Sequence, residues 1–142
     1  MIAVDTNILV YSHREDSPFH TSAWKNLSGL ASGPGSWSIP WPCIHEFLSI
    51  VTHPRIYQPA SPLDEALDTV QAWLESPGLV LLGEGPEYFN QLSQLLIAGK
   101  VAGPKVHDAR IAALCLSHGV RELWSADRDF SRFPALKVRN PL

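Results

Sequence analysis

Apolar residues along the chain fall into five short runs that alternate with longer segments of helical periodicity. Short aliphatic and β-branched runs bounded by turn residues are typical of buried strands. The expected strands are Ile2–Asp5, Ser36–Ile39, Leu79–Leu82, Glu122–Ser125 and Leu136–Val138. Strands that alternate with helices indicate a parallel sheet with helices on both faces. We therefore predict an α/β fold, a three-layer sandwich around a central, mainly parallel sheet.

The segments between these runs predict helices, several of which begin with proline. Proline suits the first turn of a helix because its φ is fixed near the helical value. The N–H that proline lacks would make no hydrogen bond within the helix at that position. The expected helices are Thr6–Ser12 continuing toward His20–Leu30, Pro42–Thr52, Pro62–Leu74, Pro86–Ala98 and Pro104–His118. The stretches "GPGSWSIPWP" and "HPRIYQPASP" are too short to separate domains, so we expect residues 1–142 to form a single domain.

Composition narrows the class of protein. A chain of 142 residues that is 45% hydrophobic can bury a full hydrophobic core without disulfide bonds or structural metal ions. Its two cysteines, Cys43 and Cys115, lie in apolar stretches and are interpreted as core residues of a reducing compartment, not as a disulfide or a zinc site. The N-terminus shows no secretory pattern, and no apolar run approaches the roughly 20 residues of a membrane span. A cytoplasmic protein with no membrane contact is expected.

The net charge of -3 argues against a globally basic nucleic-acid binder, but the charge is unevenly distributed. Residues 1–99 hold three Lys/Arg and ten Asp/Glu, giving -7, and residues 100–142 hold eight and four, giving +4. This asymmetry fits a metal site bordered by a phosphate-attracting patch. It fits ordinary solvated faces equally well.

Four of the fourteen acids stand out because each lies in an apolar setting or at the end of a predicted strand: Asp5, Glu46, Asp108 and Asp127. Each also has a structural explanation. Asp5 is placed to cap a helix, and Asp108 in a first helical turn complements the helix dipole. Asp127 or Asp129 could cap a short helix in "DRDFSRF". The helix around Glu46 is so apolar that burial nearly all round is expected, and such an acid needs a cation.

Together the four acids would lie at the C-terminal ends of strands or on helices that leave them, where parallel α/β sheets build their sites. Converging carboxylates repel one another unless a cation lies between them. Mg²⁺ and Mn²⁺ prefer oxygen ligands, and such ions can promote attack on a phosphodiester. Metal-dependent phosphodiester hydrolysis is therefore the first hypothesis.

The motifs "VDTNILVY", "HEFLSIVTHPR", "KVHDARIAALCLSHG" and "LWSADRDFSRF", in this order and spacing, resemble those of the PIN-domain ribonucleases, and within them the VapC toxins of type II toxin–antitoxin modules. The resemblance spans essentially the whole chain. It implies that Asp5, Glu46, Asp108 and Asp127 form the acidic quartet that binds Mg²⁺ or Mn²⁺, with Asp129 as an auxiliary ligand. Thr6 and Ser125 match small hydroxyl positions beside the acids, where the family more often has Thr at the second, and Asn7 is a further auxiliary polar residue.

The resemblance further implies an endoribonuclease that acts on single-stranded RNA such as tRNA or ribosomal RNA, a homodimer, and a cognate VapB antitoxin that covers the cleft. From the basic section we expect four candidates for contacts with RNA phosphates: Lys105, Arg110, Arg128 and Arg132. Surface solubility explains any one of them as well. The aromatic residues Trp37, Trp41, Trp73 and Phe130 are interpreted as core, not as base-stacking platforms.

Three alternatives stay open at this point. A haloacid-dehalogenase-type phosphatase also carries an Asp after its first strand, but it needs a second acid where Asn7 stands. A metal phosphohydrolase of the HD type is suggested by His107 and Asp108, with His45 and His53 nearby, but such domains are all-helical. A catalytically idle PIN fold that only binds RNA or a partner would be expected to have lost an acid.

Overall fold

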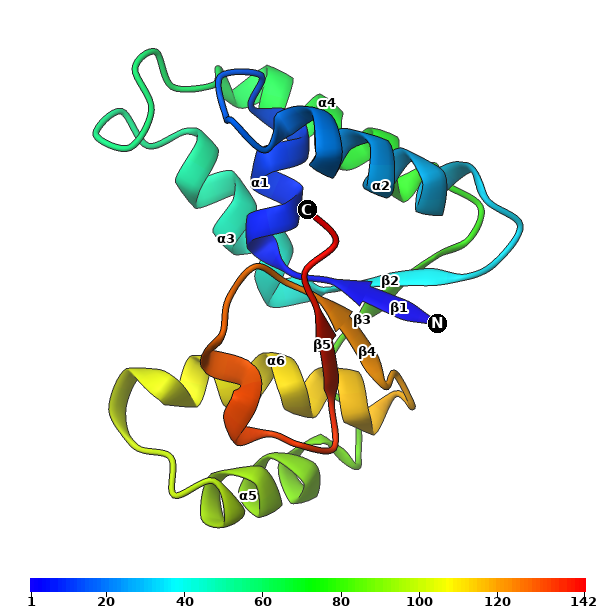
Figure 1. Cartoon of the computed structure of the whole chain (residues 1–142), viewed down its shortest axis with the longest axis vertical. Helices are drawn as coiled ribbons and strands as arrows, with labels where there is room; N and C mark the ends of the chain where they lie inside the picture. The colour runs from blue at the N-terminus through cyan, green and yellow to red at the C-terminus, as the bar shows by residue number, and fades with distance from the viewer.

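The computed structural model describes all residues 1–142 and contains one five-stranded sheet with helices on both faces (Figure 1). The strands are β1 (Ile2–Val4), β2 (Trp37–Pro40), β3 (Leu79–Leu82), β4 (Glu122–Trp124) and β5 (Lys137–Arg139). The helices are α1 (Thr6–His13), α2 (His20–Ser32), α3 (Trp41–Val51), α4 (Leu63–Leu74), α5 (Tyr88–Ala98) and α6 (Val106–Ser117). The predicted three-layer α/β fold is confirmed.

The sheet has the order β3-β2-β1-β4-β5, and every neighbouring pair is parallel. Helices α1 to α4 lie on one side of it and α5 and α6 on the other (Figure 1). The chain runs from β1 outward to β2 and β3, and then returns to the opposite side of β1 with β4. Such a reversal of strand order leaves a crevice at the carboxyl ends of the strands. The fold therefore offers a site beyond the ends of β1 and β4.

The core is a cluster of 29 buried residues between the sheet and the two helical layers. Ala3, Trp37, Ile39 and Leu123 contribute from the sheet and are fully buried. Both cysteines are free and buried, as expected for core residues. Of the four aromatic residues interpreted as core, only Trp41 is not, because it begins α3 at its open side and is 39% exposed. No helix of the structure is long and apolar enough to cross a membrane.

The predicted helix starts need adjustment at the prolines. Pro62 is the N-cap of α4 and not its first residue, Pro86 lies outside α5, and Pro104 lies in a 3₁₀ turn (Gly103–Lys105) ahead of α6. The predicted continuation of the first helix is two helices, α1 and α2, joined by a turn from Arg14 to Phe19. Helix α6 ends at Ser117, and two residues later Gly119 turns the chain with a φ of +75°, a conformation that glycine adopts without strain.

Candidate functional site

A cleft of about 620 Å³ lies at the carboxyl edge of the sheet, between α1, α3 and α6. Each helix lines it with one stripe of residues, such as Thr6, Asn7, Val10 and Tyr11 on α1. Four predicted acids line it: Asp5, Glu46, Asp108 and Asp127. They come from four segments that are far apart in the sequence, and the crossover of the sheet brings them together.

Asp5 follows β1 directly and is the N-cap of α1, as the structural explanation predicted. Its side chain is buried, with Oδ1 accepting the backbone N–H of Thr6 at 2.8 Å and the Cys43 thiol at 3.5 Å. Oδ2 accepts the Ser125 hydroxyl at 2.7 Å. Burial raises the pKa of Asp5, although these hydrogen bonds act in the opposite direction and the nearby Glu46 adds to the rise. The carboxylate is thus held rigidly at an energetic cost that a cation would offset.

Glu46 lies one turn into the apolar helix α3, but the expectation that it is buried nearly all round is wrong. His45 and Glu46 are both exposed, because the side of α3 that faces the cleft has no helix packed against it. No cation pairs with Glu46; instead its Oε2 accepts the Thr6 hydroxyl at 2.6 Å. The Glu46 carboxylate is therefore stabilised by solvent and by the Thr6 hydroxyl, and not by the buried cation that the sequence pattern predicted.

Asp5 and Glu46 form one acidic group, and Asp108, Asp127 and Asp129 form a second one. One carboxylate oxygen from each acid of the second group lies within 4.8 Å of the others, although Asp129 does not line the cleft itself. Burial, followed by the charges of Asp127 and Asp129, raises the pKa of Asp108. Asp127 Oδ1 also accepts the backbone N–H of Asp129 at 2.8 Å. The 3₁₀ turn Asp129–Arg132 nevertheless has Arg128 as its N-cap and no side-chain cap, so the capping role predicted for Asp127 or Asp129 is wrong.

Ser125 and Asn7 connect the two acidic groups. The Ser125 hydroxyl, which donates to Asp5, accepts from the Asp127 backbone N–H at 3.0 Å and from Asn7 Nδ2 at 3.2 Å. Asn7 Oδ1 in turn accepts the backbone N–H of Ala126 at 3.1 Å. These contacts fasten the loop after β4 to the start of α1, so the positions of Asp5 and Asp127 are fixed relative to each other.

The four basic residues expected to contact RNA phosphates differ in whether an acid already pairs with them. Lys105 pairs with Asp129 and lies 4.0 Å from Asp108, so its charge is directed at the acids. Arg110 lines the cleft but is paired with Glu84 at 3.0 Å. Arg128 and Arg132 are exposed on the loop and 3₁₀ turn beside the acids and form no ion pair. These two arginines retain the most capacity to bind phosphate.

Several residues that line the cleft were not selected from the sequence. His45 and His107, considered above only as a sign of an HD-type phosphohydrolase, both line it, and so do Tyr11, Ile50 and Tyr57. Tyr57 lies in the loop between α3 and α4, in the stretch interpreted only as a turn. Its position depends on contacts with α1, which no local pattern reveals.

The donor chemistry of this site fits a hard divalent cation. The acids present only carboxylate oxygens, which Mg²⁺ and Mn²⁺ prefer. The sulfur in contact with Asp5 belongs to Cys43, and burial raises the pKa of this thiol well above its usual value, so it stays protonated. A thiolate ligand is therefore not available to a metal here.

Comparisons with known proteins identify the family and agree with the fold. The PIN domain family matches residues 2–136. Ribonuclease VapC43 of Mycobacterium tuberculosis is 35% identical over 143 aligned residues, which cover 100% of this chain and 96% of that protein. The crystal structure of VapBC2 from Rickettsia felis, bound to a DNA fragment from its promoter, matches with a TM-score of 0.71 at 19% identity over 99% of this chain and 98% of that one. VapC20 of M. tuberculosis, a toxin that cleaves the sarcin-ricin loop, matches with a TM-score of 0.70 at 17% identity over 99% and 100%.

Proposed function

The chain belongs to the PIN-domain family, and on that premise we propose that it is an endoribonuclease of the VapC toxin type. It hydrolyses phosphodiester bonds in single-stranded regions of RNA, with tRNA and ribosomal RNA as the expected substrates. One observation carries the proposal: acids from four distant segments line a single cleft at the switch point of the sheet. A protein that only binds RNA has no need of such a concentration of negative charge, which repels phosphate.

The cofactor that we propose is Mg²⁺ or Mn²⁺. Asp5, Glu46, Asp108 and Asp127 would hold it, and Asp129 is an auxiliary ligand. When bound, a divalent cation supplies stabilisation for the negative charge that builds up on the phosphate and on its attacking and leaving oxygens.

The chain's own residues position these carboxylates before any substrate arrives. Ser125 orients Asp5 through Oδ2, and Thr6 orients Glu46 through Oε2. The second oxygen of Glu46 has no protein partner and stays open to the cleft, where it can accept a proton from a water molecule. Rigid donors of this kind reduce the reorganisation needed in the transition state.

Arg128 and Arg132 are proposed as the principal contacts with RNA phosphates, since their charges are unpaired in the structure. Arg110 is a weaker candidate because Glu84 already neutralises it, and Lys105 acts on the acids more than on RNA. Phosphate contacts of this type position the strand without selecting its sequence.

We further propose a cognate VapB-type antitoxin as partner, with a C-terminal segment that covers the cleft, and a homodimer as the assembly. The structural relative from R. felis is a VapBC complex, which supports the choice of antitoxin. Two buried free cysteines are in keeping with a cytoplasmic location.

The test is to incubate the purified protein with total RNA and either Mg²⁺ or Mn²⁺, and to compare it with Asp5→Asn. We expect the original chain to cleave RNA and to leave 5′-phosphate and 3′-hydroxyl ends, EDTA to stop the reaction, and Asp5→Asn to be inactive. Equal cleavage by both proteins would refute the proposed site. RNA binding without cleavage would favour the idle PIN fold, and turnover of a small chromogenic phosphate ester that depends on Asp5 would favour a phosphatase.

A further inference from the structure

The cleft has two chemically different ends. The acids come from the start of α1, the middle of α3, the first turn of α6 and the loop after β4, whereas Val10, Tyr11 and Ile50 line the cleft further along α1 and α3, and Tyr57 lines it from the loop after α3. Tyr11 lies six residues after Asp5, which corresponds to about 9 Å along α1 at 1.5 Å per residue. The far end therefore carries aromatic and aliphatic side chains at roughly the reach of one nucleotide from the acids.

Tyr57 is held in place by a cation. The guanidinium carbon of Arg14 lies 4.2 Å from the centre of the Tyr57 ring, a cation–π contact. Arg14 is itself fixed, because Nε and an Nη donate to the two oxygens of Asp16 at 2.9 and 2.7 Å. Arg14 covers one face of the ring, and Tyr57 also lines the cleft, so the remaining ring surface is available to a ligand there.

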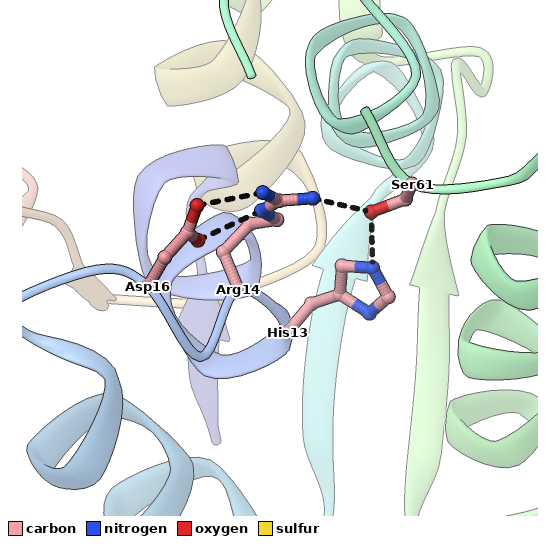
Figure 2. A network of polar contacts seen from close by, with 4 residues as sticks. All are labelled: His13, Arg14, Asp16 and Ser61. Atoms are coloured by element: carbon pink, nitrogen blue, oxygen red, sulfur yellow. Dashed lines mark hydrogen bonds and ion pairs between the residues drawn. The ribbon is translucent and has the colours of Figure 1, made fainter. Parts of the chain in front are cut away.

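The loop that carries Tyr57 is anchored at its other end by buried Ser61 (Figure 2). The Ser61 hydroxyl is shared between Arg14, at 3.2 Å, and His13 Nε2, at 2.9 Å. The Ser61 backbone N–H donates to Val51 at the end of α3, at 2.8 Å. The loop between α3 and α4 is thus tied to the C-terminal end of α1, and the Tyr57 ring is ordered in advance of binding.

The cation that faces the Tyr57 ring is not available to a phosphate. Asp16 neutralises the Arg14 guanidinium through two hydrogen bonds. A flat ligand with apolar faces matches a rigid aromatic ring lined by aliphatic side chains. An unpaired base of single-stranded RNA has this chemistry, and such bases stack on aromatic side chains without need of a charge.

We propose that the Tyr57 end of the cleft is a subsite for an unpaired nucleobase that neighbours the scissile phosphate. Tyr57 is the stacking platform, and Arg14 is a positioning residue that holds its ring. The inference rests on the proposed ribonuclease function. It assigns a binding site to a nucleobase, the part of the substrate that the acids cannot bind.

The test uses Asp5→Asn as a background that binds RNA without cutting it, with Mg²⁺ present. A fluorescent single-stranded oligonucleotide is titrated and its anisotropy gives the affinity. Tyr57→Leu is expected to weaken binding about five- to a hundredfold, the range for the loss of one stacked base. Tyr57→Phe keeps the ring and retains affinity within about twofold. Phe89→Leu, which removes an aromatic ring that is 73% exposed on α5 outside the cleft, is the matched control and leaves affinity unchanged.

A second set of oligonucleotides distinguishes binding of a base at Tyr57 from binding of the sugar–phosphate backbone there. Oligonucleotides with an abasic site at successive positions should include one position at which Tyr57→Leu causes no further loss, because the stacking partner is already missing. Arg14→Met should lower affinity for the intact probe and spare the abasic one. The inference is overturned if Tyr57→Leu binds as well as Phe89→Leu, or if its loss is the same on a fully abasic strand. The proposed function fails separately, and the inference with it, if the unmodified chain cleaves no RNA.

Discussion

Ser125→Ala removes a single hydroxyl that serves three neighbours. This hydroxyl donates to Asp5 Oδ2 at 2.7 Å and accepts from the Asp127 backbone N–H and from Asn7 Nδ2 at 3.0 and 3.2 Å. Ser125 is 2% exposed, so water cannot reach the vacated partners without local opening. The variant leaves a buried carboxylate with one hydrogen bond fewer.

The expected loss follows from these contacts. A hydrogen bond to a charged group contributes about 1.5–3 kcal/mol, and unpaired buried neighbours add to its loss, so we expect unfolding to become easier by about 2–4 kcal/mol. An unfolding entropy of about 2.1 cal/mol/K per residue gives about 0.3 kcal/mol/K for 142 residues. The midpoint of thermal unfolding should therefore fall by about 7–13 °C. The pKa of Asp5 should rise further, because the Ser125 hydrogen bond now lowers it.

Thermal unfolding followed by circular dichroism without divalent cations measures this change. Ser125→Thr is the matched control, since it keeps the hydroxyl and places the residue that the family more often has at this position. We expect the Thr variant to unfold within about 2 °C of the original chain. An Ala variant as stable as the original, or a Thr variant as unstable as Ala, would refute the role assigned to this hydroxyl.

Two further predictions rest on charges in the structure, and a third tests the proposed homodimer. Burial raises the folded-state pKa of Asp5 and of Asp108 above the unfolded value, so the ionisation of these acids destabilises the fold. The metal-free protein should therefore become more stable as the pH falls through the raised pKa values. In denaturant titrations, Asp5→Asn should reduce this gain in stability. Lys105→Met removes a cation that competes for Asp129 and Asp108, so calorimetry should find Mn²⁺ bound several-fold more tightly; weaker binding would contradict this role. Light scattering should give a mass near twice 15.7 kDa, whereas a mass of one chain would rule out the homodimer.

The strands and the order of layers are predictable from sequence because short aliphatic runs between turn residues have few other uses in a chain of this size. Every predicted strand overlaps the observed one, with shifts of one residue at the ends. The helix starts are less exact. A proline marks the region where a helix begins, but the same residue is found at the cap, in the first turn or shortly before it, as Pro62, Pro42 and Pro86 illustrate.

The acids of the site are visible in the sequence because a carboxylate at the end of a predicted strand or within an apolar helix is conspicuous. The environment of these acids cannot be read from the sequence in the same way. The apolar pattern of α3 suggested a buried Glu46, since a pattern counts side chains and not the helices that pack against them. Tyr57 was missed because Arg14 and Ser61 determine its position from elsewhere in the chain. Contacts between distant segments, which decide the shape of the cleft, leave no local signal.

We propose that acids from four segments hold one divalent-cation site in one cleft. Titration with Mn²⁺, with the free ion followed by electron paramagnetic resonance, tests it directly on the original chain and on Asp5→Asn, Glu46→Gln, Asp108→Asn and Asp127→Asn. Asp68→Asn, on the exposed face of α4, is the control. We expect each of the four substitutions to weaken Mn²⁺ binding at least about tenfold while the control binds normally. Binding that none of the four acids affects, or no binding by the original chain, would rule out the proposed cation site.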